Sequence, residues 1–290
     1  MEGRHNNFIS SINGLVCLRE NKCFRVWNPS IRLTSKRSPA FSEEMLWIPY
    51  NAFFGYDKVN PYNAFFGYDK VNDKYKVLTF GRVGRGRNIR HMTRLYTFGE
   101  SYWTTIQDLP FDPNNLCECQ IFVNGNLHWL TNRRDGSLKL VIISFDVEKE
   151  TYGEVLLPPK LDGKIRDLDL HVSNNYLYVW QFSHKSNYVL WLMKEYGVQE
   201  SWTKLMIIPR KSFHISRSHI CGYSDPLLSP LCILGNGVVV LRTTCSRSYL
   251  VMYVSKNGKF GCYCRITRSS HPWCGGIHHE SLVSPPYVST

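Results

Sequence analysis

The feature that most constrains the fold is a unit of four short strands that repeats along the chain. Its clearest copy spans residues 120–157, in which Asn124-Gly125 favours the positive φ angles of a tight hairpin turn. The strands expected in this copy are residues 120–123, 126–130, 138–145 and 152–157. One four-stranded antiparallel sheet cannot bury both of its faces alone. The unit therefore requires neighbours built in the same way.

Five units of this kind can be read in the sequence. Four of them share the order strand, Asn-Gly or Asn-Asn turn, strand, loop, strand, polar turn, strand. The expected third strands begin near Phe24, Leu95, Leu140, Tyr188 and Tyr249. Four-stranded units at a spacing of roughly 40 to 50 residues are typical of a β-propeller. The sequence therefore predicts an all-β, kelch-like β-propeller of four-stranded antiparallel blades, with five legible repeats and room for a sixth or seventh blade.

The propeller is expected to form one domain over residues 8–285, between an N-terminal tail (1–7) and a C-terminal tail (286–290). Propellers often close by pairing the two chain ends in one blade. We therefore expect residues 280–284 to form a last strand that partners the N-terminal strand. A sixth blade would fit between Lys36 and Lys76 or after Ile266.

A tandem duplication interrupts the second unit. Residues 49–60 and 61–72 are the same twelve residues, PYNAFFGYDKVN. The second copy runs directly into DKYKVLTF and so predicts a hairpin, whereas the first copy is expected to be a looped-out insertion. A surface loop tolerates such an insertion because its closure entropy grows only logarithmically with length.

Composition favours a globular protein, since 43% of the residues are hydrophobic and 14% are aromatic. The N-terminus has no apolar signal-peptide core, and no apolar run is long enough to span a bilayer. We therefore expect a cytoplasmic or nuclear protein without a membrane partner. The formal net charge of +12 could attract acidic partners or nucleic acid, although a nucleic-acid partner is not expected from charge alone.

Basic loops are the expected contact elements. The segment 81–87, GRVGRGR, lacks the Gly-Lys-Ser/Thr ending of a phosphate-binding loop and does not open a helix. It is expected to be a flexible connection that can contact an acidic partner. The loops considered are 35–44, 81–90 and 210–218, because loops on a rigid scaffold can vary without harming the core. The residues expected to bind a partner are Arg82, Arg85, Arg87, Arg90, Arg210 and Lys211.

No cofactor, metal or catalytic residue is predicted. The residues His271, Cys274, His278 and His279 lack the rigid frame of a zinc site, and Cys17, Cys221, Cys232 and Cys245 are expected to be buried free thiols. His128, Trp129 and Trp180 are expected to pack within strands, and Trp103 and Trp202 to hold equivalent core positions of two units. A hydrolase acting on the same architecture is the alternative. It would need polar side chains on the inner strands, and the candidate inner strands are mostly apolar.

Several of these stretches together resemble the F-box associated interaction domain of plant F-box proteins. The matching motifs are NGLVCL (13–18), VWNPS (26–30), GYD (67–69), DKYKV (73–77), VNGNLHWL (123–130), ISFDVEKETYGEVLLP (143–158), WLMKEYGVQESWTKL (191–205) and ESLVSP (280–285). They cover the chain from about Phe8 to Pro285, and LMKEYG before SWTKL is the most distinctive.

The resemblance implies a kelch-like module that recruits a target protein for ubiquitination by a cullin-based E3 ligase. In that family the module follows an F-box, a small helical domain that docks onto the ligase adaptor. The seven residues before Phe8 are too few for an F-box, so an adaptor is an expected partner only if an F-box is supplied elsewhere. The alternatives are a stand-alone binding protein, a truncated product without ligase function, or a basic nucleic-acid binder.

Overall fold

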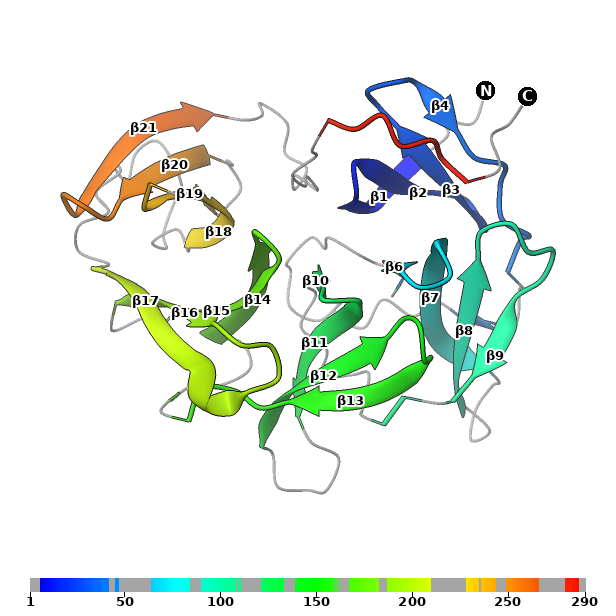
Figure 1. Ribbon diagram of the computed structural model, residues 1–290, viewed down its shortest axis with the longest axis horizontal. Helices are drawn as coiled ribbons and strands as arrows, with labels where there is room; N and C mark the ends of the chain where they lie inside the picture. Colours follow the sequence, from blue (N-terminus) through cyan, green and yellow to red (C-terminus); the bar gives the residue numbers. More distant parts are fainter. Residues whose placement is uncertain are drawn as a thin grey trace. The chain divides into compact units, whose positions relative to one another are not determined.

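The described residues of the computed structural model form five antiparallel β-sheets (Figure 1). They belong to two compact units, which are described separately. The first unit contains the first and second sheets, the second unit contains the fourth and fifth, and the third sheet contributes residues to both. The structure describes residues 6–41, 45–46, 64–83, 90–107, 109–110, 121–132, 139–159, 161, 167–182, 187–209, 228–234, 236–243, 249–265 and 280–286.

The first two sheets follow the predicted order of strands. The first sheet consists of β1 (Asn6–Ile12), β2 (Leu15–Glu20), β3 (Cys23–Asn28) and β4 (Leu33–Thr34). The second consists of β5 (Met45–Leu46), β6 (Ala64–Asp69), β7 (Lys74–Val83), β8 (Arg90–Thr97) and β9 (Thr104–Ile106). The fifth strand of the second sheet departs from the predicted four, because the short β5 shares an edge of β7 with β6.

The other three sheets each have four strands in sequence order. The third contains β10 (Ile121–Val123), β11 (Asn126–Asn132), β12 (Leu140–Asp146) and β13 (Thr151–Val155). The fourth contains β14 (Leu168–Ser173), β15 (Tyr176–Gln181), β16 (Tyr188–Met193) and β17 (Trp202–Ile208). The fifth contains β18 (Leu228–Ile233), β19 (Val238–Thr243), β20 (Tyr249–Val254) and β21 (Lys259–Arg265). These sheets confirm the all-β class and the four-stranded repeat.

The Asn-Gly and Asn-Asn pairs form the hairpin turns that the repeat predicts. In the third sheet, φ is 51° at Asn124 and 76° at Gly125, and β10 pairs directly with β11 across the turn. Asn174 and Asn175 take φ values of 50° and 60° between β14 and β15. Positive φ at both central residues matches the right-handed twist of the flanking strands, and Asn and Gly adopt it at the least steric cost.

The second copy of the duplicated dodecamer forms β6, as predicted. Ala64 pairs with Thr79 and Asp69 pairs with Lys74, whereas β5 pairs through Leu46 with Arg82 on the same edge of β7. The first copy, 49–60, lies outside the described residues. Its segment, 47–63, therefore connects two strands that occupy neighbouring stretches of one edge.

Deleting one copy of the dodecamer is expected to preserve the fold. Deletion of either copy gives the same product because the copies are identical, and it shortens the connection between Leu46 and Ala64 from 17 residues to five. Their partners Arg82 and Thr79 are three residues apart, roughly 10 Å along a strand, which five residues span readily. We expect the free energy of unfolding to rise by about 1 kcal/mol from the shorter loop. Chemical denaturation measures this change, and loss of the cooperative transition would contradict it.

The C-terminal segment 280–286 contacts the first sheet without forming a strand. The side-chain amide of the buried Asn28 donates hydrogen bonds to the carbonyl oxygens of Ser281 (2.8 Å) and Val283 (2.7 Å), and the Ser281 amide donates to Ser30 Oγ. The prediction of a last strand at 280–284 is therefore wrong, because a side chain at the end of β3 takes the place of a strand ladder.

Equivalent tryptophans join consecutive sheets within each unit. Trp103 Nε1 donates to the carbonyl of Pro39, and Trp202 Nε1 donates to the carbonyl of Leu156, at 2.9 and 2.8 Å. Trp103 immediately precedes β9 and Trp202 is the first residue of β17, the last strands of their sheets, and each acceptor follows the last strand of the preceding sheet. This confirms the predicted equivalence of the two tryptophans. The described part of the chain contains no helix with the length and apolar character needed to cross a membrane.

Candidate protein-interaction surface

The structure locates two of the six predicted contact residues. Arg82 pairs with His91 near the end of β7, and Arg90 is the first residue of β8 and pairs with Val83. Both therefore lie on strands beside the connection 84–89 rather than within a free loop. The remaining predicted residues lie outside the described residues: Arg85, Arg87, Arg210 and Lys211. Partner binding by this set stays a prediction.

The described part of the predicted contact loop 35–44, residues 35–41, is a strap fixed along β3. The Ser35 amide donates to the Val26 carbonyl while the Val26 amide donates to Ser35 Oγ, and Ser38 forms the same pair of bonds with Phe24. The serine hydroxyls thus supply acceptors that a regular fourth strand would supply from its backbone. The expectation of a variable surface loop is therefore corrected for this part, because Ser35 and Ser38 are buried.

The strap still presents basic side chains to solvent. Lys36 and Arg37 are exposed, and Arg37 Nε lies 2.6 Å from the Glu20 carboxylate, which also lies 3.7 Å from Arg25. One carboxylate between two guanidinium groups leaves this edge of the first sheet with net positive charge. Surface ion pairs of this kind add little stability, so the charge is available to an acidic partner.

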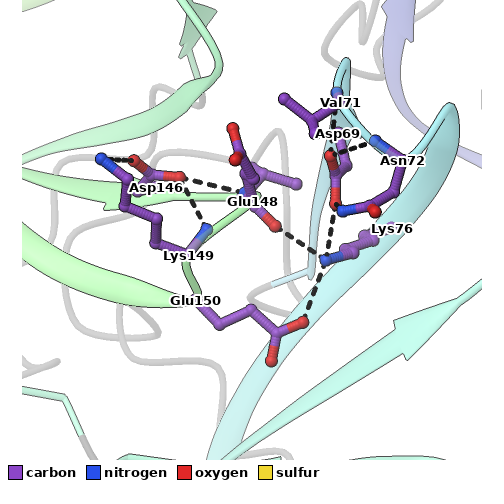
Figure 2. Close-up of polar contacts among 9 residues, drawn as sticks. Asp69, Val71, Asn72, Lys76, Asp146, Glu148, Lys149 and Glu150 are labelled. Carbon is purple, nitrogen blue, oxygen red and sulfur yellow. Dashed lines mark hydrogen bonds and ion pairs between the residues drawn. The ribbon is translucent and has the colours of Figure 1, made fainter.

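A buried ion network, which the sequence did not predict, joins the second sheet to the β12–β13 turn (Figure 2). The ammonium group of Lys76 on β7 donates to the Val147 carbonyl (2.8 Å) and to the Glu150 carboxylate (2.9 Å), and it lies 3.1 Å from Asp69 Oδ2. The Lys76 side chain is 7% exposed and that of Asp69 is 0% exposed. The three donors of the ammonium group thus have three acceptors, so the network is built for structure rather than for ligand binding.

Asp69 also closes the turn between β6 and β7. Its carboxylate accepts hydrogen bonds from the amides of Val71 and Asn72 and from the Asn72 side chain (Figure 2). Burial by itself raises the pKa of Asp69, but the hydrogen bonds from Asn72 and Lys76 outweigh it and hold the pKa below its ordinary value. The carboxylate is thereby kept charged opposite Lys76.

Close packing accompanies the network. A side-chain carbon placed on Gly67 of β6 would lie 2.8 Å from Val147 Cγ2, so only glycine allows this approach. Asp146 shapes the β12–β13 turn. Its carboxylate accepts hydrogen bonds from the backbone amides of Glu148 and Lys149, which turns the chain toward Lys76 (Figure 2). The motifs GYD, DKYKV and FDVEKE were visible in the sequence, but their contact is tertiary.

A second polar cluster lies on the first strands of the fourth and fifth sheets. Asp169 Oδ2 on β14 accepts a hydrogen bond from Ser229 Oγ on β18 (3.1 Å) and lies 3.2 Å from His171 Nε2. The sequence argument against catalysis named only apolar inner strands and missed this cluster. Ser229 donates to the carboxylate rather than to the imidazole, which is opposite to the arrangement that activates a serine nucleophile.

The predicted burial is confirmed for His128, Trp129, Trp180 and Cys17 and only in part for Cys232. His128, Trp129 and Trp180 are each 0% exposed, and Trp180 stacks on Tyr188. Cys17 is a buried free thiol whose pKa is raised by burial, and Cys232 is a partly buried free thiol. Among the described residues no group of three or more His, Cys, Asp or Glu could hold a metal ion. The candidate ligands His271, Cys274, His278 and His279, and also Cys221 and Cys245, lie outside the described residues.

A match to a protein-family model identifies the family of this chain. The model described as F-box associated beta propeller domain matches residues 5–273. The chain belongs to this family. The five sheets are the blades of the propeller class that the family name states, which confirms the predicted fold and the resemblance.

The similar curated proteins are F-box proteins of Arabidopsis thaliana. The F-box/kelch-repeat protein At3g23880 is 26% identical over 87% of this chain and 62% of its own length. The putative F-box protein At4g21240 is 25% identical over 88% of this chain and 58% of its own length. The F-box protein CPR1 is 23% identical over 74% of this chain and 56% of its own length. The chain thus spans about 60% of the length of the first two relatives.

Proposed function

We propose that this chain is the substrate-recognition part of an F-box subunit of a cullin-based E3 ubiquitin ligase, and that it binds a target protein for ubiquitination. The observation that carries the proposal is the match of the F-box associated beta propeller domain to residues 5–273. The relatives that cover most of the chain are named as F-box proteins, which supports the same role. Residues Arg82, Arg85, Arg87, Arg90, Arg210 and Lys211 are proposed to contribute positive charge to target binding.

The role requires binding rather than catalysis. Within a sheet, paired strands hold the connecting loops in fixed positions, which suits selection of a partner. The ion network at Lys76 and the cluster at Asp169 both use their polar groups on each other. We therefore propose that the chain acts without a cofactor, in the cytoplasm or nucleus, and that the ligase adaptor joins through an F-box.

Affinity capture from plant cells treated with a proteasome inhibitor tests the proposal. The expected result is a captured protein whose ubiquitinated form accumulates with the chain and whose abundance rises when the chain is removed. If the abundance and ubiquitination of the captured protein do not change when the chain is removed, the result would favour the alternative that the chain is a stand-alone binding protein. Recovery of nucleic acid, released steeply by salt, would favour the nucleic-acid alternative instead.

A further inference from the structure

Three basic side chains gather around one carboxylate in the first sheet, and we call this group the basic corner. Arg25 lies on β3, and Lys36 and Arg37 lie on the strap that runs along this strand. Arg37 Nε donates a hydrogen bond of 2.6 Å to the carboxylate of Glu20, which also lies 3.7 Å from Arg25 Nη1. Lys36 forms no ion pair within the described part of the chain. The basic corner therefore carries three positive charges and one negative charge.

The backbone that carries these side chains is held at several points. Ser35 and Ser38 bond β3 through both their backbone and hydroxyl groups, and they flank the two basic residues of the strap. Arg25 lies between the two β3 residues that these serines contact, and it pairs with Leu18 on β2. Because the cations are carried by fixed backbone, binding through them costs less conformational entropy than binding through a free loop.

Arg25 points away from the core of the first unit. Its neighbours Phe24 and Val26 are fully buried in that core, and successive side chains of a strand point to opposite faces. The side chain of Arg25 is 25% exposed and that of Arg37 is 46% exposed. Both guanidinium groups are therefore open to a ligand from solvent.

The guanidinium group of Arg25 makes no hydrogen bond to another described residue. The Glu20 carboxylate at 3.7 Å is beyond hydrogen-bond distance, and the buried Arg25 Nε has no acceptor. A guanidinium group has five N–H donors, and it binds a carboxylate most strongly through two parallel hydrogen bonds. Arg25 therefore has donors left for an oxygen ligand.

Glu20 shows which chemistry fits the basic corner. Its carboxylate is 13% exposed and lies within ion-pair distance of two guanidinium groups, so one carboxylate is already held among the three cations. A second carboxylate still leaves the group with net positive charge, so it is attracted rather than repelled. Nucleic acid fits less well, because its binding relies on many phosphate contacts and the basic corner offers three cations around a carboxylate.

We propose that the basic corner binds an acidic segment of the target protein, whose Asp or Glu carboxylates contact Arg25 and Lys36 beside the ion pair of Glu20 and Arg37. This rests on the proposed function, since it names the surface and the class of segment that target binding would use. Glu20 limits the affinity, because its negative charge opposes that of the ligand. The partner is therefore a segment rich in Asp and Glu rather than a neutral or basic one.

A phage-displayed library of random peptides, about 12 residues long, provides the probe when it is selected on the full chain and counter-selected on the variant Arg25→Glu. We expect the enriched peptides to carry neighbouring Asp or Glu residues. The best synthetic peptide should bind Arg25→Glu at least about tenfold more weakly. The matched control is Lys256→Glu, the same change of charge on the exposed turn between β20 and β21, which should alter the affinity by less than about twofold. Urea denaturation checks that both variants fold.

The variant Glu20→Gln tests the basic corner in the opposite direction. Glutamine keeps an acceptor for Arg37 but removes the negative charge, so the acidic peptide should bind about two- to fivefold more tightly. Unchanged or weaker binding to Glu20→Gln would overturn the proposal, as would equal effects of Arg25→Glu and Lys256→Glu. A single-stranded oligonucleotide that binds the same residues more tightly than the peptide would also overturn it.

The two proposals can fail separately. If a captured and ubiquitinated target binds Arg25→Glu as well as it binds the native chain, the basic corner is not its binding site and the proposed function stands. If acidic peptides bind at the basic corner but no captured protein changes in abundance or ubiquitination, the inference about the basic corner stands and the proposed function fails.

Discussion

Replacing Lys76 by methionine is expected to lower the free energy of unfolding by about 3–5 kcal/mol. Methionine keeps most of the apolar length of lysine but removes the ammonium group that faces Val147, Asp69 and Glu150. The carboxylate of Asp69, which is fully buried, then has no cation beside it. The cost comes mainly from that uncompensated charge, since Glu150 is partly exposed and can be solvated.

Urea denaturation at neutral pH measures the loss, and Lys149→Met is the matched control. Lys149 is 71% exposed and lies 3.9 Å from Asp146, so its ion pair should contribute less than about 1 kcal/mol. Adding Asp69→Asn to Lys76→Met should recover part of the stability because it removes the unpaired charge. Equal effects of Lys76→Met and Lys149→Met would show that the buried network does not stabilise the fold.

Local patterns were sufficient to predict most strands of this protein. The turn at Asn124-Gly125, the alternation of apolar residues and the polar turns between strands are properties of short stretches. β16 and β20 begin at the predicted residues Tyr188 and Tyr249, and the four strands of the third sheet differ from their predicted bounds by at most two residues at each end. The hairpin of the second dodecamer copy was predicted correctly because that copy continues directly into the β7 sequence, whereas the prediction for the first copy lies outside the described residues.

The wrong predictions concern two segments that are held by hydrogen bonds to side chains in place of a regular strand ladder. The strap at residues 35–41 looked like a loop because it is polar and contains proline, yet Ser35 and Ser38 bond the edge of β3. The segment 280–284 looked like a strand, yet Asn28 holds it through a side-chain amide. Serine and asparagine are typical of both loops and such contacts, so composition alone does not separate the two.

The candidate surface was predictable only in part. Basic residues could be counted from the sequence, but the grouping of Arg25 with the two basic residues of the strap around Glu20 depends on the course of the strap along β3. Lys36 and Arg37 lie in a loop that was considered as a contact, whereas Arg25 was expected only to belong to a strand. A strand residue of this kind can be assigned to a surface only when the neighbours of its strand are known.

The two polar clusters also depend on tertiary packing and could not be predicted from local sequence. The charged residues Lys76, Asp69 and Glu150 are far apart in the sequence, and their contact depends on the packing of β7 against the β12–β13 turn. Asp169, His171 and Ser229 meet in the same way on two neighbouring sheets. Both clusters connect sheets, which indicates that buried polar residues of this chain hold blades together while the exposed edges and loops remain for a partner.

Mild acid is expected to destabilise the protein through His128. The His128 imidazole is fully buried, and burial lowers its pKa from 6.5 to about 4. Hydrogen bonds with the backbone of Ile121 and Asn126 act in the opposite direction but are outweighed. In the unfolded chain the imidazole binds a proton near pH 6.5, whereas in the folded chain it stays neutral until about pH 4. The unfolded state therefore binds more protons between these values, and stability falls as the pH falls through that window.

The lowered pKa of His128 alone corresponds to a fall of about 3 kcal/mol in the free energy of unfolding between pH 7 and pH 4. Urea denaturation at intervals across that range, for the native chain and for His128→Gln, isolates it because glutamine does not titrate. We expect the difference in unfolding free energy between the two proteins to shrink by about 3 kcal/mol as the pH falls, with His128→Gln the less stable at neutral pH. Carboxylates such as Asp69 titrate in both proteins and cancel in the comparison. A difference that is independent of pH would mean that His128 is protonated in the folded chain, and the buried imidazole would then need an anionic partner.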